Sequence, residues 1–233
     1  MSSTPEEGTA LILVDVQRDF VDGSLAVPGA VSILPLLNHL IEAYAWDMIV
    51  ATQDYHPKDH ISFASVHDAT PFQPLSVPHP YEKDVTLSQM MWPVHCVGGT
   101  PGAEIDARIQ PALAACQARG IPVHYVHKGQ DANIDSYSGF ASNLYLAFTE
   151  LASVLYRHTP HIKTLVLCGL ATDYCVQATA IDAVKFGFRT FLVESCAKGV
   201  DPATTEKALS TMKAYGVITV PDTAKLTSII QKQ

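Results

Sequence analysis

The sequence predicts an α/β protein of three layers, in which helices cover both faces of a mostly parallel, roughly six-stranded sheet. The first observation behind this prediction is a series of short, continuous apolar runs, most of which end at a polar residue or a glycine. The second is that segments with apolar residues at helical spacing separate these runs. No linker or repeat interrupts the series, so we expect residues 1–233 to form a single domain, with 1–8 flexible.

The elements follow one another in a regular alternation. The apolar runs predict buried strands at 10–14, 48–52, 121–127, 164–168, 189–193 and 217–220. Helical spacing predicts helices at 32–45, 104–119, 141–156, 172–186 and 203–215. Gly120 and Gly187 stand where two of these helices should end. Residues 55–102, rich in Pro, His and Ser, match neither pattern, and a connection this long is usually functional.

Composition and charge narrow the class of protein. The net charge is −8 with scattered Lys and Arg, which argues against nucleic acid or an anionic membrane as a partner. The five cysteines form no C-x-x-C pair, and an odd number does not suit a disulfide framework. The first residues lack the apolar core of a signal peptide, and Pro and Gly interrupt the apolar stretch at 25–46. We therefore expect a soluble, reduced, cytoplasmic protein.

Reactive side chains follow four of the apolar runs. Asp15 follows the first, Asp54 and His56 the second, Lys128 the third, and Cys175 lies just inside the helix after the fourth. The carboxyl ends of parallel strands meet at one edge of a sheet, where ligands bind. The order therefore predicts one cleft that contains a carboxylate, metal ligands, a lysine and a thiol.

Cys175 is a candidate nucleophile. Thr172 or Asp173 can cap the following helix, which would leave Cys175 in its first turn. Free N–H groups and the positive helix end would favour a thiolate there and could hold an oxyanion. The alternative is a small buried hydrophobic residue, which is how we interpret the remaining cysteines, Cys96, Cys116, Cys168 and Cys196.

The charged residues at the strand ends each allow two interpretations. Asp15 and Lys128 are either a general base with its partner cation or a structural ion pair. Asp54 and His56, together with His95, suit Zn, Fe or Mn with positions left for water or substrate. His60, His67 and His79 lie in the same segment, and spacing alone does not choose among the histidines.

With these residues aligned, the chain resembles the nicotinamidase branch of the isochorismatase-like hydrolases. The matching segments are VDVQRDF at 14–20, TQDYHP at 52–57, WPVHC at 92–96, KG at 128–129 and GLATDYCVQATA at 169–180. Each is weakly specific, but five in the right order span nearly the whole chain. The resemblance implies conversion of nicotinamide to nicotinic acid and ammonia through a cysteine thioester, in NAD salvage. Pyrazinamide, a close isostere, should also be cleaved.

The resemblance also implies roles for the matching positions. The catalytic triad would be Asp15, Lys128 and Cys175, with the N–H groups of Ala171 and Cys175 as oxyanion hole. One divalent metal, most simply Zn with Fe or Mn as alternatives, would be bound by Asp54, His56 and His95. The substrate ring would be enclosed by Phe20, Trp92, Tyr137, Ala171 and Tyr174. Asp135 would lie near the metal, a cis peptide would fall at Leu170–Ala171, and a homo-oligomer is compatible.

Two rival interpretations share the scaffold. Isochorismatase lacks the nucleophilic cysteine, and N-carbamoyl amidohydrolases keep the triad but generally lack the three metal ligands, so Cys175 and Asp54, His56 and His95 favour nicotinamidase. A different hydrolase of the same fold is therefore the first rival, and a non-catalytic metal- or ligand-binding relative is the second. A substitution in the triad would be its mark, and the sequence contains none.

Overall fold

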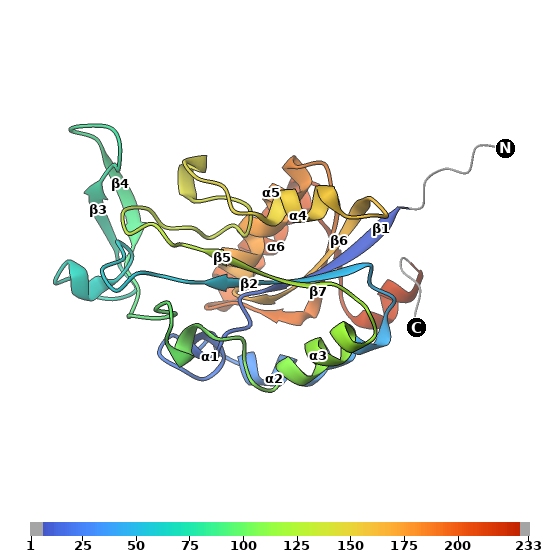
Figure 1. The fold of residues 1–233 in the computed structure, drawn as a ribbon. Coiled ribbons are helices and arrows are strands. Elements are labelled where there is room, and N and C mark those ends of the chain that lie inside the picture. Colours follow the sequence, from blue (N-terminus) through green and yellow to red (C-terminus); the bar gives the residue numbers. More distant parts are fainter. Residues whose placement is uncertain (1–6, 229–233) are drawn as a thin grey trace.

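The computed structural model, described over residues 7–228, contains a sheet of six parallel strands in the order β5-β2-β1-β6-β7-β8 (Figure 1). Its strands are β1 (Gly8–Val14), β2 (Met48–Asp54), β5 (Val123–Lys128), β6 (Ile162–Leu170), β7 (Arg189–Lys198) and β8 (Ile218–Val220). The predicted parallel sheet is confirmed. Several strands extend beyond their apolar runs because backbone pairing continues, as between Asp54 and Lys128.

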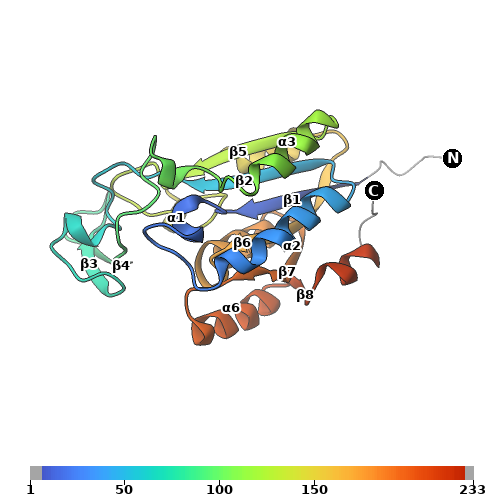
Figure 2. The same ribbon diagram turned by 90° about the horizontal axis from the view of Figure 1, so that it is seen from below.

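Helices cover both faces of this sheet (Figures 1 and 2). Alternate residues of β1 point to opposite sides: Leu11 and Leu13 pack in the core beneath α2 (Ala30–Ala43) and α3 (Gln110–Ala118). Ala10, Ile12 and Val14 pack in the second core with α4 (Leu151–Arg157), α5 (Gln177–Lys185) and α6 (Pro202–Ala214). Because both sides of β1 are buried, the strand is apolar throughout. The three-layer prediction is confirmed.

Two predicted helices are shorter than their apolar spacing indicated. Within 141–156 only α4 is α-helical, because Ser142 N donates to Ala147 O and Thr149 N donates to Phe140 O, which closes a compact loop. The large apolar residues of that loop, such as Leu144, are exposed, although their spacing in the sequence resembles the apolar face of a helix. The helix predicted at 104–119 begins at Gln110, because Asp106 N donates to Val16 O and ties the preceding segment to the turn after β1.

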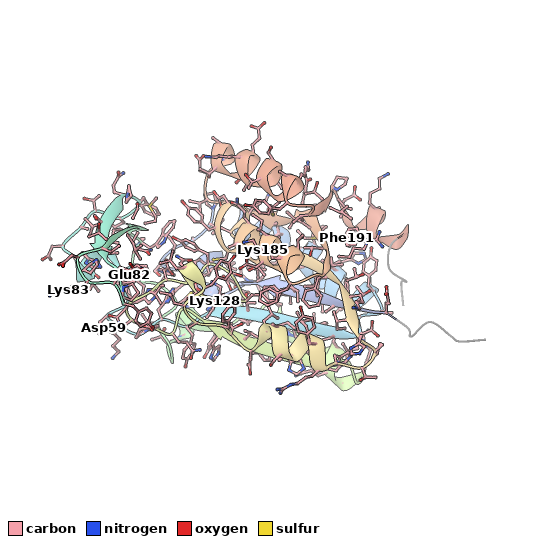
Figure 3. All side chains as sticks on the ribbon, turned by 90° about the horizontal axis from the view of Figure 1, so that it is seen from above. Asp59, Glu82, Lys83, Lys128, Lys185 and Phe191 are labelled. Carbon is pink, nitrogen blue, oxygen red and sulfur yellow. The ribbon has the colours of Figure 1, made fainter. Side chains whose placement is uncertain are left out.

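The long segment 55–102 contains an antiparallel hairpin of β3 (Pro74–Pro78) and β4 (Thr86–Met90). The hairpin lies beyond the end of the sheet at which the strands terminate, and Glu82 and Lys83 stand near its tip (Figures 1 and 3). Short 3-10 turns at Ala64–Val66 and Pro101–Ala103 flank it. The hairpin leads directly into Trp92, so this segment delivers residues to the ends of the strands.

The remaining elements are short. They are α1 (Arg18–Val21), a π-helical turn at Thr172–Val176, and 3-10 turns at Asn143–Tyr145 and Thr223–Ser228. Of the segment 1–8 expected to be flexible, residues 1–6 lie outside the described residues. Gly8 belongs to β1, where its N–H donates to His161 O at 2.8 Å. Among the described residues, no helix is long and apolar enough to span a membrane.

Gly169 on β6 packs tightly against the backbone of Val14 on β1. Its φ is +116°, and a Cβ there would lie 2.1 Å from Val14 O. We expect Gly169→Ala to lower the free energy of unfolding by about 4 kcal/mol or more, since it adds a clash to an unfavourable φ. Gly187→Ala is the matched control, because its φ is also positive but a Cβ would meet nothing within 4 Å. Urea unfolding should give the control a loss of only about 1–2 kcal/mol. Equal losses would contradict the close approach.

Candidate active site and metal centre

The strand order explains where the reactive residues meet. The chain runs from β1 to β2 and β5 on one side, then returns to β6 on the other side of β1. Such a reversal leaves a crevice at the carboxyl ends of the central strands. Asp15 directly follows β1, Asp54 and Lys128 end their strands, and Cys175 follows β6. Figure 3 shows Lys128 inside the body of the protein.

Lys128 lies at the centre of this group. Its Nζ is 2.9 Å from Asp15 Oδ2, forms a very short contact with Asp54 Oδ1, and donates to Ser136 O at 3.0 Å. It is also 3.3 Å from Cys175 Sγ. Carboxylate oxygens of Asp15 and Asp54 and the sulfur of Cys175 all lie within 4.8 Å of one another. The structure therefore brings the three predicted triad residues together, around one fully buried ammonium.

Burial and charge set the protonation of this group. Burial lowers the pKa of Lys128, but Asp15 and Asp54 outweigh that effect and hold the pKa well above its usual value. Burial raises the pKa of Asp15 and is only partly offset by Lys128. Burial also raises the pKa of Asp54, but there Lys128 and His56 prevail and the pKa is lowered. Asp15 is thus the stronger proton acceptor of the two carboxylates.

Cys175 is a thiol in the resting protein. Burial raises its pKa well above the usual value, and Lys128 offsets this only in part. The sulfur lies in a buried π-helical turn rather than at an open helix end, so burial opposes the stabilisation of a thiolate that a helix start would provide. A neighbouring base must take the proton before the sulfur can attack.

The predicted helix cap is also wrong. No side chain caps the turn at Thr172–Val176. The Asp173 carboxylate instead accepts hydrogen bonds from Val200 N at 2.9 Å, from Asp201 N at 3.2 Å and from Thr204 Oγ1 at 2.5 Å. Asp173 therefore joins the loop that carries Cys175 to the start of α6. The cis peptide expected at Leu170–Ala171 is present.

Asp54, His56 and His95 form a group with the chemistry of a metal site. Asp54 Oδ2 is 3.6 Å from His56 Nε2 and 3.9 Å from His95 Nε2. The opposite ring nitrogens are fixed by backbone carbonyls: His56 Nδ1 lies 2.8 Å from Gly129 O, and His95 Nδ1 lies 2.7 Å from Pro93 O. This pattern leaves both Nε2 atoms free to ligate. The residues therefore fit a divalent cation with further positions open.

His60 and Asp135 extend this group. The His60 ring stacks on His56 at 3.9 Å, its Nδ1 contacts Ser62 Oγ, and its Nε2 is buried without a hydrogen-bond partner among the described residues. Ligand atoms of His56, His60 and Asp135 also lie within 4.8 Å of one another. Asp135 accepts hydrogen bonds from Gln89 Nε2 and Ser136 N. Sequence spacing did not separate His60 from the other histidines of its segment, and its nearness to the Asp54–His56 pair was the one available signal.

Loading this site with metal should release a proton. Burial lowers the pKa of His56, but Asp54 outweighs that effect and raises it, whereas burial and His56 lower the pKa of His95 to about 4. Protons and metal compete for His56, so apparent zinc affinity should rise about tenfold per pH unit up to the raised pKa and then level off. Calorimetry of the metal-free protein in buffers of different ionisation heat measures the released proton. Zinc binding near pH 6 without proton release would contradict this expectation, and His79→Ala should leave it unchanged.

An aromatic cavity adjoins the thiol. The predicted wall residues Phe20, Trp92, Tyr137, Ala171 and Tyr174 all line it, as do Asp54, His95, Asp135 and Cys175. The Trp92 and Tyr174 rings meet edge to face at 4.9 Å, and Trp92 Nε1 donates to Tyr137 OH at 3.3 Å. Sequence reasoning missed three apolar residues of the lining, Leu25, Val27 and Val200, which belong to irregular segments without periodicity. Its aromatic lining has the chemistry to pack against a flat ring.

A larger cavity of ≈590 Å³ lies on the other side of Tyr137 and Tyr174. Its further lining includes Tyr145, Asp182 and Lys185, whose ammonium is already paired with Asp182 at 3.1 Å. Neither the thiol, nor Lys128, nor any predicted metal ligand borders it. Because Cys175, Asp54 and His95 border the smaller, aromatic cavity, that cavity is the candidate active site.

Comparison with known proteins agrees with this fold. The family model of the isochorismatase domain matches residues 136–224. The chain is 41% identical to the nicotinamidase of Acinetobacter baylyi, over 89% of this chain and 90% of that protein. A solved nicotinamidase structure from Acinetobacter baumanii superposes with a TM-score of 0.80 at 36% identity, over 96% of this chain and 100% of that one. A pyrazinamidase of Pyrococcus horikoshii in complex with zinc gives a TM-score of 0.67 at 33% identity, over 91% and 98%.

The fold and the site define an isochorismatase-like α/β hydrolase. Within that class, the chain belongs to the nicotinamidase family.

Proposed function

We propose that this protein hydrolyses nicotinamide to nicotinic acid and ammonia, and pyrazinamide in the same way. The observation that carries the proposal is the buried contact of Cys175 Sγ with Lys128 Nζ, at 3.3 Å, beside an aromatic cavity. A nucleophile, a base and a cation next to a pocket with an aromatic lining suit attack on an amide attached to an aromatic ring. The same family membership supports a role in NAD salvage.

In this mechanism Asp15 accepts the proton of Cys175, and Lys128 stabilises the resulting thiolate. The sulfur attacks the amide carbon to form a C–S bond, and the N–H groups of Ala171 and Cys175 hold the oxyanion. Asp15 then gives its proton to the leaving nitrogen, the C–N bond breaks, and ammonia departs. Water attacks the thioester, which releases nicotinic acid and returns the proton to Cys175.

Asp54, His56 and His95 would hold one divalent metal in this site. A carboxylate with two imidazoles suits zinc, and the zinc complex of the Pyrococcus horikoshii relative supports that choice over Fe or Mn. When bound, the metal would supply a Lewis acid that orients the substrate through its ring nitrogen. The protein's own contribution here is to fix the two imidazoles through Gly129 O and Pro93 O.

The test is ammonia release from nicotinamide by the purified protein, compared with a chelated sample and one resupplied with zinc. Benzamide, which has the same ring size but no ring nitrogen, is the matched substrate control. We expect fast, metal-dependent release from nicotinamide and slow release from benzamide. A folded, zinc-loaded protein that releases no ammonia would overturn the proposal and favour N-carbamoyl compounds on the same scaffold.

The five cysteines agree with a reducing compartment such as the cytoplasm, the location we propose. All five are free thiols and all five are buried. The four sulfurs other than that of Cys175, which lines the aromatic cavity, are shielded from solvent and are not positioned for exchange with an external disulfide.

A further inference from the structure

Thr52 and Asp15 form a closed arrangement of hydrogen bonds at the ends of β1 and β2. The Asp15 N–H lies 3.2 Å from both Thr52 O and Thr52 Oγ1. Thr52 Oγ1 in turn lies 2.6 Å from Asp15 Oδ1. Both residues are fully buried, so no solvent competes for these contacts. Because the hydroxyl accepts from the backbone N–H, its single proton is available for the carboxylate.

These contacts give the two carboxylate oxygens of Asp15 different partners. Oδ1 is occupied by the Thr52 hydroxyl, whereas Oδ2 lies 2.9 Å from Lys128 Nζ. Rotation of a carboxylate about its last side-chain bond is soft, so an aspartate alone does not hold one orientation. The backbone of Asp15 is also in the left-handed region, with φ at +48°, and the N–H contacts to Thr52 hold it there.

The Thr52 side chain is itself held in place. A Cβ added at Gly139 would lie 3.0 Å from Thr52 Cγ2, which shows how closely that backbone packs on the methyl group. Gly139 N also donates to Thr179 Oγ1 at 2.9 Å, so the packing segment is anchored to α5. A β-branched residue with its methyl group confined has one orientation available for its hydroxyl.

We infer that Thr52 is a positioning residue, which aims Asp15 Oδ2 at the proton of the Cys175 thiol. The transfer moves that proton from Sγ to Oδ2 and leaves a thiolate and a neutral carboxylic acid, with no net change in charge. Thr52 touches neither the thiol nor the aromatic cavity, and it acts only through Asp15. The inference rests on the proposed function in one respect, that Asp15 is the base for Cys175.

The test compares Thr52→Val, which keeps the shape and loses the hydroxyl, with Thr52→Ser, which keeps the hydroxyl. A hydrogen bond to a charged group is at stake, so kcat of Thr52→Val should fall about 10- to 100-fold. KM should stay within about twofold, because the cavity lining is unchanged. Thr52→Ser should recover most of the loss, and zinc content should match the wild type in both. Thr190→Val is the control, since Thr190, on β7, is also buried but its hydroxyl donates to Phe188 O.

A second readout does not depend on the substrate. Alkylation of Cys175 by iodoacetamide also requires removal of its proton, so Thr52→Val should slow it by a similar factor. If the wild type fails on nicotinamide while the variant still slows alkylation, the substrate assignment is wrong and the inference stands. If kcat and alkylation are both unchanged in Thr52→Val, or if Thr52→Ser loses as much as Thr52→Val, the inference is overturned. If Thr52→Val does not fold, Thr52→Ala can be compared with Thr52→Ser instead, since these two variants also differ in the presence of the hydroxyl.

Discussion

Cys175→Ala is expected to lower kcat for ammonia release by about 10⁴- to 10⁶-fold, since no other group can form the thioester. The fold should survive, because the change removes one sulfur from a small buried side chain. Zinc content should also be unchanged, because Asp54, His56 and His95 remain. The measurement is steady-state ammonia release with metal analysis and thermal unfolding of the same samples.

The matched control for this substitution is Cys116→Ala. Cys116 is also fully buried, but it lies in α3, where its sulfur is 3.5 Å from Ile41 O. The Cys116→Ala protein should be somewhat less stable than the wild type and should keep the wild-type kcat. A Cys175→Ala protein that retained a tenth of wild-type turnover would exclude covalent catalysis by this residue.

Lys128→Met is expected to have two large effects. Turnover should fall because the thiolate loses its cation, and the free energy of unfolding should fall by about 3–5 kcal/mol because buried carboxylates lose their partner. The comparison is made by urea unfolding of the metal-free proteins. Lys185→Met removes a half-exposed lysine paired with the buried Asp182, whose carboxylate keeps its hydrogen bond from Tyr145 OH, and it should cost about 1 kcal/mol or less.

The stability loss in Lys128→Met should depend on pH with a definite sign. Without the ammonium, burial raises the pKa of both Asp15 and Asp54 in the folded state. A carboxyl with a raised folded pKa is favoured in the folded protein at low pH and penalised as the pH rises above its unfolded value. The gap between the variant and the wild type should therefore be larger near about pH 8 than near about pH 5.5. A gap independent of pH would contradict the ion-pair geometry.

The sequence predicted the sheet and the triad for the same physical reason. Parallel strands must be apolar on both faces and must end at one edge, so polar residues after apolar runs, such as Asp15 and Lys128, indicate both the strand ends and the site. The wall residues were accessible only through the family resemblance, because Trp92 and Tyr137 lie in irregular segments. The catalytic roles of Asp15, Lys128 and Cys175 and the binding roles of the wall residues are predictions, which variants at these positions test.

The features that the sequence did not predict depend on tertiary contacts. Leu25 and Val200 reach the cavity from turns whose course no periodicity encodes. The exposed Leu144 mimics a helical stripe, so the helix at 141–156 was predicted too long. The protonation of Cys175 follows from burial, which a linear pattern does not reveal. In the sequence Thr52 resembles any other strand residue, and only the folded structure shows that its hydroxyl bonds Asp15.

The central position of β1 has a consequence for the order of folding. The first strand of the chain pairs with β6, so that Val14 lies beside Gly169, and this contact closes most of the chain into a loop. Contacts so distant in sequence form late, because the entropy of closure is lost before the pairing compensates for it. During synthesis β1 can pair with β2 first, but its pairing with β6 must wait until β6 emerges, and Asp15 cannot meet Cys175 earlier. Recovery of activity after denaturation should accordingly coincide with the last phase of refolding, not with the formation of helices.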